Sequence, residues 1–180
     1  AANMAVFNLL ENGDHVILCD DIYGGTFRIC DEIFSKFNCE FSYVDMTELD
    51  NIKKALRPET KMIFLETPTN PMMKVADIQE IAKIAKENNC IFVVDNTFLT
   101  PYFQRPLDLG ADIVVHSGTK YLTGHNDVIA GIVVVKDPER IPFFQGQIKS
   151  MGAQLGPFDC WLILRGLKTL SLRMRQHDEN

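Results

Sequence analysis

The 180-residue chain lacks the features that would place it at once among membrane or nucleic-acid-binding proteins. It has no apolar run near the roughly 20 residues that a membrane span needs, and no run of lysine and arginine. Its 18 basic and 24 acidic residues give a formal net charge of −6, which disfavours binding to nucleic acid or to an anionic membrane. Apolar residues make up 46% of the chain, and this much apolar surface excludes disorder.

Metal-binding and disulfide patterns are also missing. The five cysteines are odd in number and include no Cys-x-x-Cys pair, so a zinc site is not expected. Free thiols in a reducing cytosol are the simplest account of them, which predicts a cytoplasmic protein. No metal-ligand spacing relates the four histidines, for which we expect structural or loop roles: His15, His116, His125 and His177.

Short β-rich runs alternate with runs of helical period along the chain. Strands are predicted at residues 15–20, 40–45, 61–66, 90–95, 112–116 and 130–135. Helices are predicted at residues 2–10, 27–37, 48–56, 75–88 and 157–180, and loops at 67–72 and 100–106. Several strands are apolar on both faces, which is typical of a sheet covered on both sides. The alternation predicts an α/β fold with a mainly parallel sheet.

Polar side chains follow four of these strands, at residues 20–26, 66–71, 95–97 and 116–120. In open α/β sheets, ligands bind outside the carboxyl ends of the strands. The fold alone does not require so many polar groups at one edge of the sheet. We therefore expect these four segments to form one site.

Lys120 is the candidate nucleophile of this site. A lone lysine in a loop is usually a solvated charge, but a lysine in its neutral form can form a Schiff base. The hydroxyls of Ser117 and Thr119 flank Gly118 just before it, an arrangement that suits a phosphate oxygen. A Walker A loop is excluded because Thr119 precedes the lysine and Tyr121 follows it, and no Gly-x-Gly-x-x-Gly occurs.

Four further residues complete the candidate site. Asp95 ends a strand, either as the partner of a protonated ring nitrogen or as the cap of the next turn, and Thr97 could orient its carboxylate. Tyr23 could stack on a ring or be an ordinary loop aromatic, and the amide of Asn70 could bind a carboxylate or lie in a plain turn. A lysine, a hydroxyl pair, an acid and a stacking aromatic are what pyridoxal phosphate needs.

The chain resembles the Cys/Met-metabolism enzymes that depend on pyridoxal phosphate, the cystathionine lyase and synthase group. Six stretches in order carry the resemblance: residues 21–26, 66–71, 93–98, 101–106, 116–121 and 165–170. It implies the fold type I, aminotransferase-like large domain over residues 1–180, incomplete because the family's N-terminal arm and C-terminal domain are absent. It also implies a homotetramer in which dimers share active sites.

The resemblance further implies a role for each candidate residue. Lys120 would bind the cofactor as a Schiff base and later move the α-proton. Asp95 would pair with the pyridine nitrogen, and Tyr23 would stack on the ring and assist proton transfer.

The remaining four residues would contact other parts of the cofactor and the substrate. Ser117 and Thr119 would bind the phosphate, Thr97 would support the ring site, and Asn70 would contact the carboxylate of a small sulfur amino acid such as cystathionine.

The resemblance leaves the choice of reaction open. The loop at residues 23–26 has no cysteine after the tyrosine, which disfavours a methionine γ-lyase. Cystathionine γ-lyase, which catalyses an α,γ-elimination, is the first expectation, with cystathionine γ-synthase and cystathionine β-lyase as close alternatives. A catalytically silent domain that only associates is the alternative from another class.

Overall fold

The computed structural model describes residues 1–180 and contains one six-stranded sheet. The strands are β1 (His15–Cys19), β2 (Glu40–Val44), β3 (Thr60–Glu66), β4 (Ile91–Asp95), β5 (Ile113–Ser117) and β6 (Gly131–Val135). Their order across the sheet is β2-β1-β3-β4-β5-β6. All pairs are parallel except β5 and β6, which are antiparallel. The predicted α/β fold is confirmed, and each predicted strand lies within one residue of the observed bounds.

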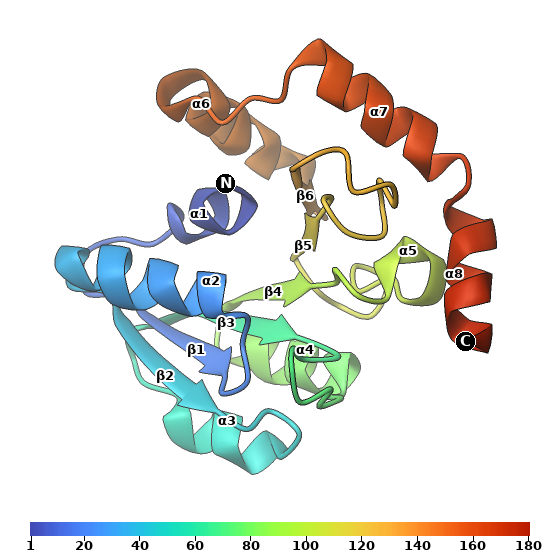
Figure 1. Ribbon diagram of the computed structural model, residues 1–180. Helices are drawn as coiled ribbons and strands as arrows, with labels where there is room; N and C mark the ends of the chain where they lie inside the picture. The colour runs from blue at the N-terminus through green and yellow to red at the C-terminus, as the bar shows by residue number, and fades with distance from the viewer.

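Helices cover both faces of this sheet (Figure 1). Helices α1 (Ala2–Phe7) and α2 (Gly24–Arg28) lie on one side, and α3 (Leu49–Ala55) and α4 (Ile78–Glu87) lie on the other. The remaining helices are α5 (Thr100–Phe103), α6 (Ile141–Met151), α7 (Pro157–Leu167) and α8 (Leu170–Glu179). Short turns of other helix types occur at η1 (Ile29–Ile33), η2 (Phe34–Phe37) and η3 (Pro138–Arg140). None of the helices is long and apolar enough to cross a bilayer.

The helix predictions were less accurate than the strand predictions. The helix expected from residue 75 begins at Ile78, because the side chain of Asp77 caps it by accepting from Gln79 N and Glu80 N. Val75 was expected on the buried stripe of that helix, but it precedes the helix and is 69% exposed. The expected loop at residues 100–106 contains α5, and α6 was not predicted.

The helix predicted at residues 157–180 is two helices, α7 and α8. The break is stabilised by side chains that satisfy the last carbonyls of α7. The hydroxyl of Thr169 donates to the carbonyl of Gly166 at 3.1 Å, and the guanidinium of Arg173 donates to the same oxygen at 2.9 Å. Carbonyls at the end of a helix have no partner within it, so such contacts stabilise its termination.

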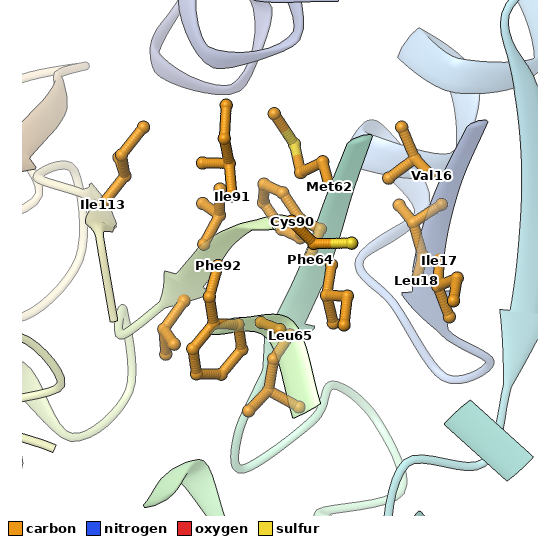
Figure 2. Close-up of a cluster of buried hydrophobic side chains, with 14 of the residues drawn as sticks. Val16, Ile17, Leu18, Met62, Phe64, Leu65, Cys90, Ile91, Phe92 and Ile113 are labelled. Atoms are coloured by element: carbon orange, nitrogen blue, oxygen red, sulfur yellow. The ribbon is translucent and has the colours of Figure 1, made fainter. Parts of the chain in front are cut away.

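The core lies between the sheet and its helices. Figure 2 shows apolar side chains of β1, β3, β4 and β5 on both sides of the strands. Phe7 of α1 stacks on Phe64 of β3 with ring centroids 5.3 Å apart. Each such fully buried side chain contributes roughly 1.5–3 kcal/mol to folding. A core of this kind fixes the strands, and with them the residues at their carboxyl ends.

Candidate active site

A cavity of about 560 Å³ lies at the carboxyl ends of β3, β4 and β5. All seven residues predicted for the site line it: Tyr23, Asn70, Asp95, Thr97, Ser117, Thr119 and Lys120. Its volume is within the ~300–1,000 Å³ typical of cofactor and ligand sites. The structure thus brings together the four polar segments, as expected because each of them follows a strand of the same sheet.

Asp95 lines this cavity, and only one of its two carboxylate oxygens accepts hydrogen bonds from the chain. It is 8% exposed and ends β4, where it lies in register beside Glu66 of β3. Its Oδ1 accepts from the Thr97 amide at 3.1 Å and from the Thr97 hydroxyl at 2.5 Å, while Oδ2 accepts no hydrogen bond. Burial raises the pKa of Asp95 above its ordinary value. A cationic donor in the cavity would compensate this cost, as the protonated nitrogen of a pyridine ring would.

Thr97 connects Asp95 to the next strand. Its hydroxyl donates to the carboxylate of Asp95 and accepts from the amide of Ser117 at 2.8 Å. The bond from the Thr97 amide also shows that Asp95 caps the turn after β4. The two uses considered for Asp95, as an acid in a site and as a cap, are therefore compatible.

The hydroxyls of Ser117 and Thr119 differ in what they can still bind. The hydroxyl of Thr119 accepts from the Ala130 amide at 2.9 Å and lies 3.3 Å from the Ala130 carbonyl, so it ties the loop after β5 to the start of β6. The hydroxyl of Ser117 makes no hydrogen bond within the chain, and it can donate to an anionic oxygen. Phosphate binding by both hydroxyls stays a prediction, for which Ser117 is the better placed.

Lys120 is exposed on the cavity wall and forms no ion pair with the chain. The loop around it is held from two sides. The hydroxyl of Thr123 donates to the Gly118 carbonyl at 2.9 Å, and Arg173 of α8 donates to the Tyr121 carbonyl at 2.6 Å. The backbone is therefore fixed while the amine is free to react with a ligand.

Tyr23 lies at the mouth of the cavity and its side chain is 48% exposed. A Cβ atom on Gly25 would come within 2.3 Å of the tyrosine ring, so only glycine allows the ring its place over the start of α2. Asn70 is exposed across the cavity, and its side-chain amide makes no hydrogen bond within the chain. A half-exposed ring and a free amide are both available to a ligand.

Glu66 also lines the cavity but was not predicted as a site residue. It is 7% exposed, and its two carboxylate oxygens accept from the amides of Tyr23 and Asn70, both at 3.0 Å. Burial, assisted by the nearby charge of Asp95, raises the pKa of Glu66 to about 7. The sequence did carry a signal for Glu66, because it is an acid at the end of a buried strand, as Asp95 is.

His116 is the second residue of the cavity wall that sequence reasoning missed. It is 5% exposed, and its Nδ1 has no hydrogen-bond partner. Burial lowers the pKa of His116, so the neutral imidazole is the favoured form. The available signal was its place in the polar segment 116–120, which none of the other three histidines shares.

The residues of the cavity fit pyridoxal phosphate. The spare oxygen of Asp95 suits a ring N–H, the free hydroxyl of Ser117 suits a phosphate oxygen, and the unpaired amine of Lys120 suits an aldehyde. The ring of Tyr23 supplies an aromatic surface at the mouth of the same cavity. This chemistry agrees with the resemblance noted from the sequence.

Comparison with known proteins gives a match along the whole chain. The family model described as Cys/Met metabolism PLP-dependent enzyme matches residues 1–180. The chain is 53% identical to a cystathionine gamma-synthase/O-acetylhomoserine (thiol)-lyase of Bacillus subtilis, covering 100% of this chain and 48% of the relative. It is 52% identical to a cystathionine beta-lyase of Lactococcus lactis subsp. cremoris, covering 98% of this chain and 46% of the relative. The chain therefore spans about half the length of these relatives.

Solved structures give the same result. A cystathionine gamma-lyase from Lactobacillus plantarum, complexed with L-serine, is 46% identical and superposes with a TM-score of 0.93. The superposition covers 95% of this chain and 45% of that one. Such agreement extends the similarity from the motifs to the backbone of the α/β sheet and its helices.

Proposed function

Because the chain belongs to the PLP-dependent enzymes of Cys/Met metabolism, we propose that it carries the cofactor site of a trans-sulfuration lyase that cleaves cystathionine by α,γ-elimination. The observation that carries the proposal is the convergence of seven polar and aromatic residues on one cavity. Similarity to the solved cystathionine gamma-lyase supports the γ-elimination. Relatives named γ-synthase and β-lyase, at 53% and 52% identity, support the two alternative reactions.

We also propose that residues 1–180 are the cofactor-binding large domain of a longer enzyme, since the chain spans about half the length of its relatives. In that enzyme, further segments would complete the phosphate and substrate contacts. A cytoplasmic homotetramer with active sites shared across a dimer is the assembly that we propose.

In this mechanism, the bound cofactor supplies an electron sink for negative charge on the α-carbon of the substrate. Lys120 Nζ would hold the aldehyde carbon of the cofactor covalently, and as a free amine it would move the α-proton of the substrate as a general base. For the γ-reaction the same amine would act at the β-carbon. Asp95, kept ionised by the ring nitrogen, would hold that nitrogen protonated through its free Oδ2.

The other residues would hold the cofactor and the substrate in place. Tyr23 would stack on the ring and assist proton transfer, and Thr97 would orient the carboxylate of Asp95. Ser117 and Thr119 would bind the phosphate. Asn70 would donate its side-chain amide to the substrate carboxylate, which orients the α-carbon for proton transfer.

The visible absorbance of the full-length protein with pyridoxal phosphate tests the cofactor site. A lysine-bound cofactor gives a band that should be lost in Lys120→Ala and kept in Lys149→Ala, a control that changes an exposed lysine of α6. No band in the unaltered protein would refute the proposal and favour a silent association domain.

Product analysis then separates the three reactions. Ammonia, 2-oxobutyrate and cysteine formed from cystathionine indicate the γ-lyase. Pyruvate, ammonia and homocysteine from the same substrate indicate the β-lyase. Cystathionine formed from cysteine and an activated homoserine ester indicates the γ-synthase.

A further inference from the structure

Two loops form one side of the cavity mouth, and each binds a carboxylate of the other. The Tyr23 loop comprises residues 20–26, and the Asn70 loop comprises residues 66–72. Glu66 of the Asn70 loop accepts from the amide of Tyr23 at 3.0 Å. In return, Asp21 Oδ2 of the Tyr23 loop accepts from the Thr69 hydroxyl at 2.5 Å and from the Met72 amide at 2.8 Å.

Neither of these carboxylates has a cationic partner. The one ion pair that involves either loop joins Asp20 to Lys74, which lies beyond the Asn70 loop, outside the cavity, and also pairs with Asp45. Burying an acid that is bonded only to neutral donors is costly, and a neutral amide would avoid the cost. An amide, however, has one acceptor oxygen and would turn its NH₂ group toward the second donor. Only a carboxylate can accept at both oxygens, as Glu66 does.

We propose that Glu66 and Asp21 are positioning residues that lock the Tyr23 loop to the Asn70 loop. The lock sets the separation between the ring of Tyr23 and the side-chain amide of Asn70, neither of which is held by a side-chain hydrogen bond of its own. The functional part of this inference rests on the proposed roles of those two residues in cofactor and substrate binding. Glu66 contributes most, because its Oε1 also fixes the amide of Asn70 at 3.0 Å.

The position of Tyr23 depends on this lock for a physical reason. Two glycines follow the tyrosine, and its ring is 48% exposed, so local packing restrains it weakly. The bond from its amide to Glu66 fixes the turn from inside the cavity. A shift of the turn by about 1 Å would misplace the ring relative to Asn70, and a misplacement of that size can cost on the order of 100-fold in rate.

Steady-state kinetics of the full-length holoenzyme test the functional part. We expect Glu66→Gln and Asp21→Ala each to lower kcat/KM about 10- to 100-fold, with a fall in kcat from the displaced ring and a rise in KM from the displaced amide. Alanine is used at position 21 because both bonds of Asp21 end on Oδ2, and a single amide oxygen could still accept them. The double variant should be little worse than either single variant, because both changes open the same lock. Lys74→Met, which removes the ion pairs outside the cavity, should change kcat/KM less than about twofold.

Hydrogen exchange tests the lock without requiring activity. The amides of Tyr23 and Met72 should exchange faster in Glu66→Gln and in Asp21→Ala than in the unaltered protein, while Lys74→Met should leave them protected. Unchanged exchange in the two lock variants would overturn the inference, as would kinetic losses that add fully in the double variant. An absent cofactor band in the unaltered protein would instead refute the proposed function, and the exchange data would still decide whether the lock exists.

Discussion

Replacing the buried carboxyl group of Glu66 by an amide should stabilise the apoprotein relative to the unaltered protein, and this relative gain should be larger at alkaline pH than at acid pH. Folding raises the pKa of Glu66 from its ordinary value of 4.5 to about 7, mainly by burial, and Asp95 and Asp21 face it with like charge. The folded protein therefore binds this proton more tightly than the unfolded chain. The contribution of Glu66 to the free energy of unfolding therefore falls as the pH rises from 4.5 through about 7.

The magnitude follows from the same two values. At about 1.4 kcal/mol per pKa unit, the difference between 4.5 and about 7 corresponds to roughly 3–4 kcal/mol. Glu66→Gln carries no titrating group, so it should avoid this loss. The hydrogen bond that the amide forfeits costs about 1 kcal/mol, but it does so at every pH and leaves the pH-dependent difference intact.

Urea unfolding of both proteins at pH 5 and pH 8, without cofactor, measures the effect. We expect the variant to gain roughly 2–3 kcal/mol relative to the unaltered protein between these two pH values, slightly less than the full difference because part of the loss occurs below pH 5. Glu87→Gln, at an exposed position of α4, should change the free energy of unfolding by less than about 0.5 kcal/mol at either pH. An equal difference between Glu66→Gln and the unaltered protein at both pH values would refute the reasoning.

Three further changes test other parts of the structure. Gly166→Ala should destabilise the protein by roughly 1–3 kcal/mol in thermal unfolding, because the new Cβ would lie 2.2 Å from the Thr123 carbonyl oxygen. The control Gly146→Ala should not be destabilising, because the new Cβ would have no atom within 4 Å. Asp77→Ala removes the cap of α4 and should cost about 1 kcal/mol in urea unfolding; no measurable loss would contradict the capping role. Asp95→Asn should lower kcat about 100-fold in the full-length holoenzyme, and a fall of less than about tenfold would speak against its pairing with a ring nitrogen.

The strands could be predicted because their signal is local. The run at Ile91–Asp95 is apolar on both faces and ends in an acid, and a parallel sheet covered by helices requires that pattern. Helix α4 shows the 3.6-residue period, but apolar spacing did not give its start. Val75 fits the period, yet it is exposed and precedes the helix, which begins after the cap residue Asp77. Helix α6 has no buried residue, but Ile141, Phe144, Ile148 and Met151 recur in it at helical spacing, so its signal was present in the sequence and was missed.

The seven predicted site residues share one property visible in the sequence, which is that they follow strands of one sheet. Glu66 shares that property too, but its function depends on which backbone amides point at it. Those amides belong to a loop 43 residues earlier in the chain and to its own turn. Likewise, the bond between the Thr119 hydroxyl and Ala130 exists only after β6 has paired with β5. Such contacts arise from the tertiary fold and leave no local pattern.

The antiparallel pairing of β5 with β6 sets the earliest point during protein synthesis at which β6 can support the loop of Lys120. Ser117 pairs with Gly131, and the loop that carries Lys120 is tied to Ala130. A nascent chain whose β1 to β5 have left the ribosome still lacks the strand that supports this loop. The loop therefore gains this support only after residue 131 has emerged, although Lys120 is already outside, and a translational pause before that point would leave Lys120 on a loop that β6 does not yet hold.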